Sequence, residues 1–544
     1  MSPLPYRIVR FLFQISSNAF YAVEVGGLEN IPPDGCPTIL CPNHSNSLTD
    51  SILLLSSVPP EKRDMIRMTA KDTFWNKTDA FSLFIKSVGT VPIKRAKDYN
   101  NAKVDNTSSF ETLEKGNCIC LFPEGISRYH SQVANFKPGI LTRNKDKEDF
   151  SVNLLTVSIV YNHREKFRSN VLVQFNPPIV LTPKHQNLLK TITEDGRRRS
   201  CEQAINELTN AMEEMIRSNS LDSPDWQTLR IAHTARKLYA GELGTRISFS
   251  EYVKLTKKFI DLMSKVKTVE NGISEGSSNN IPNGTSILDE KEFIVERVDA
   301  GNLLTVDNPE TANEKISHQG VDLAILSRDL TAYQDLLDSR GIKDYRFSNP
   351  IPLSKPALIF RIYLRVIWAF VLASLSLPGW ALWSPVFIAV KYKEYQIRKL
   401  PIEENLDEIA QYKLLISAIL LIPIYLIACF FTLPFILITS WLIPLLMWLT
   451  IRWTEDLFQS MRSCISLTKL LLLPLSEYSE IRSIRENIRM RVQELAVREL
   501  GLPENPENLI SKVRPRGMGY FSIRRRRKKD YNEVLRLWDV SAYE

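Results

Sequence analysis

The sequence of 544 residues has few cysteines and lacks several motifs that define enzyme classes. Its seven cysteines are an odd number, and no two of them are spaced as C-x-x-C. This argues against a disulfide framework and against a zinc site, and reduced cytosolic thiols are the simplest account. The sequence also has no P-loop, no glycine-rich dinucleotide fingerprint and no G-x-S-x-G nucleophile elbow. We therefore expect neither a metal nor a resident cofactor, and a serine hydrolase is disfavoured.

Two long stretches contain no charged residue at all, Val366–Val390 and Leu414–Ile451. The first has 25 residues and the second 38, whereas a helix needs about 20 to cross a bilayer. The chain is therefore predicted to be an integral membrane protein. Because Pro378 and Pro385 interrupt the first stretch, we expect it to enter and leave the membrane as a bent hairpin. The second stretch, broken near Pro434, is predicted to form two spans.

The net charge of +8 is concentrated near the carboxyl end. Arg514–Lys529 carries eight cations and no acid, so its charge equals the whole excess. Such a run can bind nucleic acid or an import receptor, or can be a solvated tail. Beside membrane segments, an anionic leaflet is the favoured partner, at about 1 kcal/mol per cation near the surface. We expect membrane lipids and no nucleic acid.

The amino-terminal stretch is apolar but short, with thirteen residues between Arg10 and Glu24, too few to span a bilayer. Arg7, Arg10, Gln14 and Ser17 recur at helical spacing and leave a broad apolar face. This favours an interfacial helix that lies on the membrane. A signal-anchor and an ordinary packed helix are the alternatives.

From about residue 35 to 240, short apolar runs alternate with helical stretches, which indicates an α/β domain with a mixed sheet flanked by helices. The predicted strands are the runs PTILCP, DMIRMTA, VGTVPIK, CICLFP, LLTVSIVY and VLVQF. With the apolar stretches above, the fold class is α/β followed by a helical transmembrane region. The predicted divisions are an interfacial helix (1–30), a catalytic α/β domain (31–265), a disordered insertion (266–318), a helical connector (319–355), transmembrane helices (356–455) and a cytosolic tail with the basic cluster (456–544).

One short stretch, NHSNSLTD, places His44 and Asp50 where an apolar run gives way to a polar turn. Its residue types would also cap a helix without any chemistry, and a histidine near an aspartate is often only a structural pair. Three further stretches follow within about 90 residues, each at the end of a predicted strand: GTVPIKR (89–95), FPEGISR (122–128) and FKPG (136–139).

In this order, these blocks resemble those of the glycerolipid acyltransferase family, H-x-x-x-x-D, G-x-x-P-I-x-R and F-P-E-G-x-S-R. The acid here comes one place late. At about 100° per residue neither this spacing nor that of the family stacks the pair on one helix face, so His44 must precede the helix proper and one extra residue is tolerated. HSNSLTD is similar to the H-A-N-Q-F-V-D form of the fungal-type glycerol-3-phosphate/dihydroxyacetone-phosphate acyltransferases. The later prolines, Pro177 and Pro178, and the K-F-R-S segment also resemble that subfamily. The resemblance covers residues 35 to 180.

The resemblance implies roles that suit the residue types. His44 would act as general base on the acceptor's hydroxyl, and Asp50 would hold its other ring nitrogen. Arginines suit an acceptor phosphate because guanidinium binds its oxygens bidentately. The candidates for acceptor binding are Arg95, Glu124, Gly125, Ser127, Arg128 and, more weakly, Lys137.

The function this implies is transfer of an acyl chain from acyl-CoA to the first hydroxyl of glycerol 3-phosphate, dihydroxyacetone phosphate or both. The protein is expected in the endoplasmic-reticulum membrane, with an even number of crossings and with catalytic domain and both termini cytosolic. The runner-up is a lysophosphatidate acyltransferase. A membrane lipid-binding scaffold with a degenerate site is the non-enzymatic alternative.

Overall fold

The structure is a computed structural model that carries side chains. It describes residues 2–72, 80–93, 107–137, 151–167, 169–181, 195–241, 247–276, 309–347, 354–399 and 406–509. The basic run 514–529, Arg95 and most of the predicted insertion, residues 277–308, lie outside the described residues.

A mixed eight-stranded sheet forms the centre of the amino-terminal half. Its order is β1-β7-β6-β2-β5-β3-β4, with β8 paired to β6. The pairs β6–β7 and β6–β8 are antiparallel and the others are parallel. The strands are β1 (Ala22–Gly26), β2 (Thr38–Pro42), β3 (Ile66–Lys71), β4 (Val91–Ile93), β5 (Cys118–Cys120), β6 (Val152–Tyr161), β7 (Asn170–Phe175) and β8 (Ile179–Leu181). This confirms the predicted α/β class with a mixed sheet.

Each of the six predicted strands overlaps an observed one, but the sequence analysis places β1 within the amino-terminal helix segment. The boundary predicted at residue 30 is therefore wrong, because the sheet already begins at Ala22. The five residues of β1 pair in parallel with β7, from Ala22 opposite Asn170 to Gly26 opposite Gln174. A strand this short owes its pairing to a partner far away along the chain, so its own sequence gives a weak signal.

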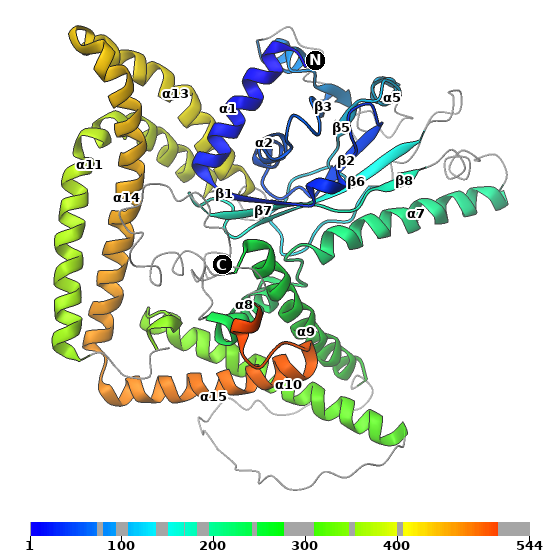
Figure 1. The fold of residues 1–544 in the computed structure, drawn as a ribbon. Helices are drawn as coiled ribbons and strands as arrows, with labels where there is room; N and C mark the ends of the chain where they lie inside the picture. The colour runs from blue at the N-terminus through cyan, green and yellow to red at the C-terminus, as the bar shows by residue number, and fades with distance from the viewer. Residues whose placement is uncertain are drawn as a thin grey trace.

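Helices cover both faces of the sheet (Figure 1). On one face, α1 (Leu4–Phe20) and α2 (Leu48–Ser57) contribute to an apolar core with strand residues such as Leu40 and Val157. On the other face, α5 (Thr107–Glu114) and α7 (Asp195–Ser218) pack on strand residues such as Ile119. A further short helix, α4 (Ala80–Ser87), precedes β4. The sheet is thus buried on both sides, as parallel sheets require.

Helix α1 buries Arg10 and Ser17 of its polar side, whereas Arg7 and Gln14 are exposed. Arg10 donates hydrogen bonds to the backbone oxygens of Val58, Arg63 and Asp64. Several apolar side chains of the helix face outward, and the exposed ones are Leu4, Ile8, Phe11, Leu12 and Ile15. An exposed apolar face fits a helix lying on a membrane surface, which stays a prediction for this segment.

A separate helical core joins parts of the chain that the sequence assigned to different segments. It is formed by α8 (Trp226–Ala240), α9 (Phe249–Gly276), α10 (Pro309–Arg340) and α15 (Leu475–Leu500). The segment after residue 456 is therefore not simply a tail, because α15 buries residues such as Ile488 and Val492 against the other helices. Likewise α9 and α10 extend into both ends of the predicted insertion, to Gly276 and from Pro309.

Within the described ranges, three helices are long and apolar enough to cross a membrane. They are α11 (Lys355–Ile397), α13 (Ile409–Phe431) and α14 (Ile436–Leu472). A break at η7 (Leu433–Phe435) separates the last two, as Pro434 predicted. Short 3-10 helices also occur at η1 (Leu28–Asn30), η5 (Asp344–Arg346), η6 (Leu406–Glu408) and η8 (Pro506–Leu509).

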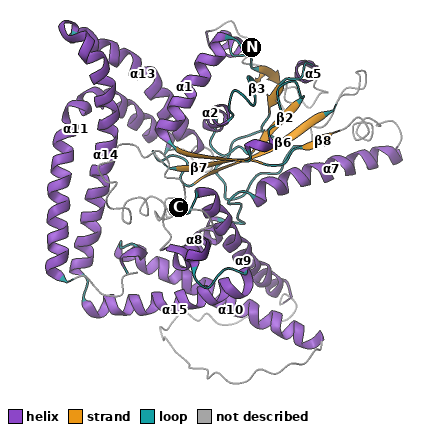
Figure 2. Cartoon of the chain, viewed as in Figure 1, coloured by secondary structure: helices purple, strands orange, loops and turns teal. Residues whose placement is uncertain are grey.

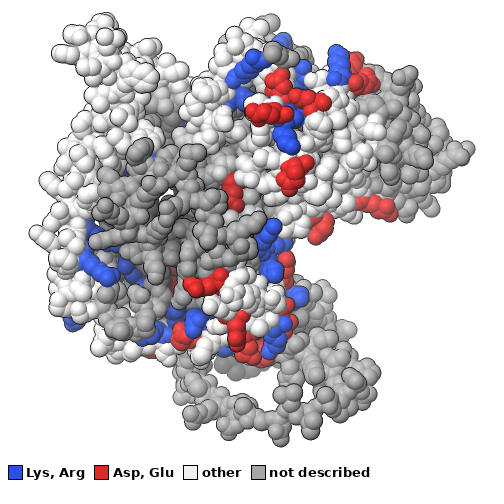
Figure 3. Space-filling model, viewed as in Figure 1, with Lys and Arg blue, Asp and Glu red and all other residues white. Residues whose placement is uncertain are grey.

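The predicted hairpin within Val366–Val390 is wrong, because α11 is one helix that retains Pro378 and Pro385. It packs on α14, where Trp383 Nε1 donates to the backbone oxygen of Met447 at 2.9 Å. Close packing against a neighbouring helix stabilises a proline-containing helix. Helix α14 also continues to Leu472, beyond the boundary predicted at 455. On the side turned to the viewer, the upper left of the molecule, where Figure 2 places the junction of α13 and α14, shows no Lys, Arg, Asp or Glu side chain in Figure 3.

Candidate active site

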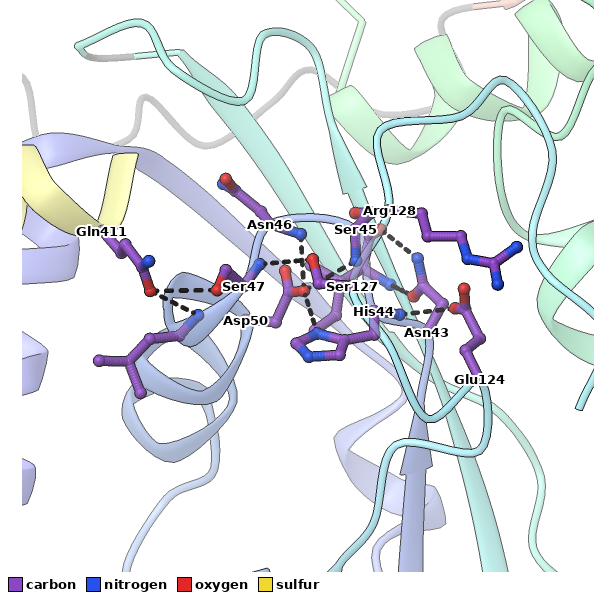
Figure 4. A network of polar contacts seen from close by, with 12 residues as sticks. Asn43, His44, Ser45, Asn46, Ser47, Asp50, Glu124, Ser127, Arg128 and Gln411 are labelled. Atoms are coloured by element: carbon purple, nitrogen blue, oxygen red, sulfur yellow. Dashed lines mark hydrogen bonds and ion pairs between the residues drawn. The ribbon is translucent and has the colours of Figure 1, made fainter. Parts of the chain in front are cut away.

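Two turns meet at the edge of the sheet where β2, β5 and β6 end. We call residues 43–50, after β2, the His44 turn, and residues 122–128, after β5, the Glu124 turn. In open sheets with parallel strands, the loops at the carboxyl ends of the strands are the usual place for a site. Figure 4 shows the polar contacts that join the two turns.

The structure brings His44 and Asp50 together. His44 Nδ1 lies 3.0 Å from Asp50 Oδ2. Helix α2 begins at Leu48, so His44 precedes the helix, as predicted because the two residues cannot share one helix face. With its Nδ1–H donated to Asp50, the neutral ring has Nε2 as its basic atom. Among the described residues, Nε2 has no hydrogen-bond partner, and the side chain is 18% exposed.

Asp50 is fully buried, and both of its oxygens accept hydrogen bonds. Oδ2 also accepts from the backbone amides of Ser45 at 2.9 Å and Asn46 at 2.8 Å. Oδ1 accepts from the hydroxyl of Tyr161, at the end of β6. Burial, with the nearby Asp50, raises the pKa of Tyr161 well above its usual value, so its hydroxyl remains a donor. These contacts fix the carboxylate against His44.

Ser47 is the residue of the His44 turn with an unfavourable backbone conformation. Its φ is 47° and its ψ is −136°, and the amide of Thr49 donates to the oxygen of Asn46 at 3.0 Å. This is close to a type II′ turn with Ser47 at the position that usually holds glycine. Such a conformation costs on the order of 1–3 kcal/mol and persists only where its surroundings hold it.

The Glu124 turn packs directly on the His44 turn. Glu124 Oε1 accepts the backbone amide of His44 at 2.6 Å, and burial raises the pKa of Glu124 to about 7. The ring of Phe122 stacks on the imidazole of His44 with ring centres 4.0 Å apart. Ser127 Oγ accepts the amide of Ser47 at 2.9 Å. In this structure Glu124 therefore orients the backbone at the histidine.

The predicted cations lie at the open side of the site. The Arg128 side chain is exposed, extends away from the His44 ring in Figure 4, and has no ion-pair partner among the described residues. The Nζ of Lys137 would lie 2.7 Å from a Cβ at Gly125, whose φ is 75°. A glycine is therefore needed at this turn. The second predicted clamp, Arg95, is outside the described residues.

Arg164 was missed by the sequence reasoning, although it lies in the block that contains the K-F-R-S segment. Its guanidinium donates to the backbone oxygens of Ser45 at 3.2 Å, Arg128 at 3.3 Å and His130 at 3.2 Å. It thereby ties the two turns together from the loop after β6. The residues around Arg164 are also charged. Its sequence context therefore does not distinguish an arginine that joins two turns from an arginine at the surface.

A pocket opens between these elements, and its lining includes His44, Glu124, Arg128, Arg164 and Asp222. It contains the candidate base and a candidate phosphate ligand together. In the part of the chain that is described, no group of three or more His, Cys, Asp and Glu side chains is placed to hold a metal ion. The arrangement can therefore bind an anion and accept a proton at one opening.

Comparisons with known proteins agree with this site. Residues 22–154 match the family model described as Acyltransferase, which includes both turns. Residues 317–504 match that described as Glycerol-3-phosphate acyltransferase 2 C-terminal domain. The chain therefore combines an acyltransferase domain with a glycerol-3-phosphate acyltransferase 2 C-terminal domain. Together the two matches cover more than half of the chain and place the membrane helices in the second family domain.

Several relatives of this acyltransferase-family chain are known. It is 24% identical over 334 residues to glycerol-3-phosphate O-acyltransferase 2 of Saccharomyces cerevisiae, covering 58% of this chain and 37% of that protein. Glycerol-3-phosphate O-acyltransferase 1 of the same yeast is 23% identical, with 58% and 36% covered. A chloroplastic 1-acyl-sn-glycerol-3-phosphate acyltransferase of Arabidopsis thaliana is 31% identical, with 25% and 38% covered. The chain thus spans less than two fifths of the yeast relatives.

Among solved structures, the 1-acyl-sn-glycerophosphate acyltransferase of Thermotoga maritima resembles 38% of this chain and 78% of its own. The identity is 20% and the TM-score is 0.26.

Proposed function

We propose that the protein transfers an acyl chain from acyl-CoA to the first hydroxyl of glycerol 3-phosphate, dihydroxyacetone phosphate or both. The observation that carries the proposal is the His44–Asp50 pair, in which Nε2 has no hydrogen-bond partner among the described residues and His44 lines one pocket with the exposed Arg128. Both yeast relatives are named for glycerol-3-phosphate acylation, and they match over 58% of this chain.

The reaction follows from this geometry. Nε2 of His44 takes the proton of the acceptor's hydroxyl as its oxygen attacks the thioester carbonyl. Asp50, held in place by Tyr161 and two backbone amides, stabilises the imidazolium that forms. The carbon–sulfur bond then breaks, and the imidazolium returns its proton to the departing thiolate. An ester and free CoA are the products.

The acceptor's phosphate would lie against Arg128, with Lys137 beside Gly125 as a further cation. We include Arg95 in this set on the motif alone. The hydroxyl oxygen of Ser127 accepts a hydrogen bond from the amide of Ser47. Ser127 would bind the phosphate with the hydroxyl proton and the lone pair that this contact leaves free. Guanidinium at such a position binds phosphate through paired, charge-assisted hydrogen bonds.

We further propose that the protein lies in the endoplasmic-reticulum membrane with an even number of crossings. Helix α15 packs with α8, α9 and α10, so chain segments before and after the apolar helices lie on one side. The beginning of α13 also contacts the catalytic domain, since Lys413 Nζ donates to the oxygen of Glu165 at 2.9 Å. On this proposal α11 does not cross the membrane, because Asp344 before it bonds to Arg485 of α15 and Lys413 after it bonds to the catalytic domain. The hairpin of α13 and α14 then crosses twice and returns to that side, which we assign to the cytosol because acyl-CoA is there.

An acceptor panel tests the proposed reaction. Membranes from cells expressing the full chain are supplied with labelled acyl-CoA and glycerol 3-phosphate, dihydroxyacetone phosphate or lysophosphatidate. We expect the two small phosphates to be acylated, to compete with each other, and to react faster than lysophosphatidate. The reverse order would favour a lysophosphatidate acyltransferase, in line with the similarity to the Arabidopsis relative. Transfer to none of the three would favour the non-enzymatic scaffold.

A further inference from the structure

The beginning of α13 lies against the His44 turn, although 363 residues separate Leu48 from Gln411. Gln411 Oε1 accepts a hydrogen bond from Ser47 Oγ at 3.1 Å and from the backbone amide of Leu48 at 3.3 Å. Figure 4 shows Gln411 facing this turn from its own helix. A side chain from the membrane-helix region thus accepts bonds from the loop that carries the candidate base.

Neighbouring residues strengthen the same contact. Asp407 in η6 is buried and lies near Ser127, whose oxygen accepts the amide of Ser47. Leu414 is buried in the core that contains α1 and α2. The segment from 406 to 414 therefore contacts both turns and the core beneath them.

Gln411 bonds to Ser47, whose backbone conformation depends on support from its surroundings. Ser47 adopts a positive φ that an L-residue rarely holds unless its surroundings fix it. The amides of Ser45 and Asn46, which fix Asp50, come just before it in the chain. Releasing Ser47 would let these amides move and loosen Asp50 beside His44.

We propose that Gln411 is a positioning residue for the His44–Asp50 pair, so that the membrane domain completes the active site of the catalytic domain. Gln411 acts through Ser47 and Leu48 and does not touch substrate. The inference rests on the proposed acyl transfer at His44. Beyond that reaction, we infer that residues of both family domains form one active site. We also infer that the side-chain oxygen of Gln411 holds the turn by accepting the two hydrogen bonds.

Two substitutions separate the accepting oxygen from side-chain size. Gln411→Glu keeps an oxygen that accepts both hydrogen bonds, whereas Gln411→Met has similar length and no comparable acceptor. Gln396→Met is the matched control, because Gln396 is exposed near the end of α11. Full-length proteins in lipid nanodiscs are assayed for kcat and for the KM of acyl-CoA and glycerol 3-phosphate.

We expect Gln411→Met to lower kcat roughly tenfold, as the loss of two neutral hydrogen bonds implies, with both KM values within about twofold. Gln411→Glu should keep at least half of the wild-type kcat, and Gln396→Met should match the wild type. Wild-type kcat in Gln411→Met, or an equal loss in Gln411→Glu, would overturn the inference. A wild-type protein without transfer activity would instead overturn the proposed function, and this inference with it.

A second variant guards against misfolding as the cause. Glycine adopts a positive φ without support, so Ser47→Gly in the Gln411→Met background should raise kcat several-fold above Gln411→Met alone. A double variant that is no more active than the single one would count against the turn as the point of action.

Discussion

The two turns at the edge of the sheet are built in different ways. In the His44 turn, the acid is fully buried and its oxygens accept bonds from His44, Tyr161 and two backbone amides. In the Glu124 turn, Glu124 is buried against the histidine's backbone, but Arg128 projects outward with an exposed side chain. One turn holds the proposed proton-transfer pair in a fixed geometry, and the other presents a cation at the opening.

This difference suggests a division of roles. A pair held by buried hydrogen bonds acts on the transition state, so its loss should lower kcat. An exposed cation that holds a phosphate binds ground state and transition state alike, so its loss should raise KM. The substitutions below test this contrast in order of expected effect.

The largest effect is expected from His44→Ala, which removes the base and leaves the sheet intact. General-base catalysis contributes about 10²–10⁴-fold, so kcat should fall by at least a hundredfold. Expression and membrane insertion should not change, because the ring is partly exposed. Activity above about a hundredth of wild type in purified membranes would contradict the base role.

Asp50→Asn should be severe but less complete. The amide leaves the size of the side chain unchanged and removes the charge that stabilises the imidazolium. We expect a fall in kcat with little change in the KM for either substrate, measured in steady state. A harmless Asp50→Ala variant would show that the acid does not act on His44.

Arg128→Lys should be milder and should change the other parameter. Lysine keeps the charge but loses the planar fork, at a cost of about 1.5–3 kcal/mol for one charge-assisted contact, or roughly ten- to a hundredfold. The loss should appear as a raised KM for glycerol 3-phosphate, whereas the KM for acyl-CoA should not change. Arg498→Lys, an exposed change in α15, is the control. A similar rise in the KM of acyl-CoA would exclude a clamp specific to the acceptor.

A separate prediction concerns the contribution of Glu124 to stability. Burial raises its pKa from 4.5 to about 7, so between these values the folded protein holds a proton that the unfolded chain has released. Stability is then fully present below pH 4.5 and is lost as pH rises through 7, by up to about 3 kcal/mol at 1.36 kcal/mol per unit.

Thermal unfolding in detergent at pH 5 and pH 8 checks this effect. Glu124→Gln keeps an acceptor for the amide of His44 but does not titrate, so its Tm should fall less between the two pH values. Glu61→Gln, at an exposed position, should behave as wild type. An unchanged fall in Glu124→Gln would assign the pH dependence to other groups.

The sequence predicted local features well. The apolar runs marked six strands, and the spacing from His44 to Asp50 placed the histidine ahead of its helix. The break near Pro434 was predicted because proline at a helix end acts locally.

Features that depend on distant contacts were not predicted. Helix α11 passes through Pro378 because α14 packs against it, so closely that a Cβ at Gly379 would lie 1.7 Å from Thr450 Oγ1. Gln411 gives no signal in its own stretch, since its partners lie more than 360 residues away. The sequence of α15 does contain a helical signal, which the predicted tail ignores. Its buried apolar residues recur at helical spacing, at Ile481, Ile488, Val492 and Leu495.

The division of roles between the two turns is tested most directly by the double variant Asp50→Asn/Arg128→Lys, measured beside both single variants. If the turns act separately, their free-energy effects add. The double variant should then show the kcat of Asp50→Asn and the raised glycerol 3-phosphate KM of Arg128→Lys. A double variant no worse in kcat/KM than Asp50→Asn alone would contradict this account, because it would show that the two turns act as one unit.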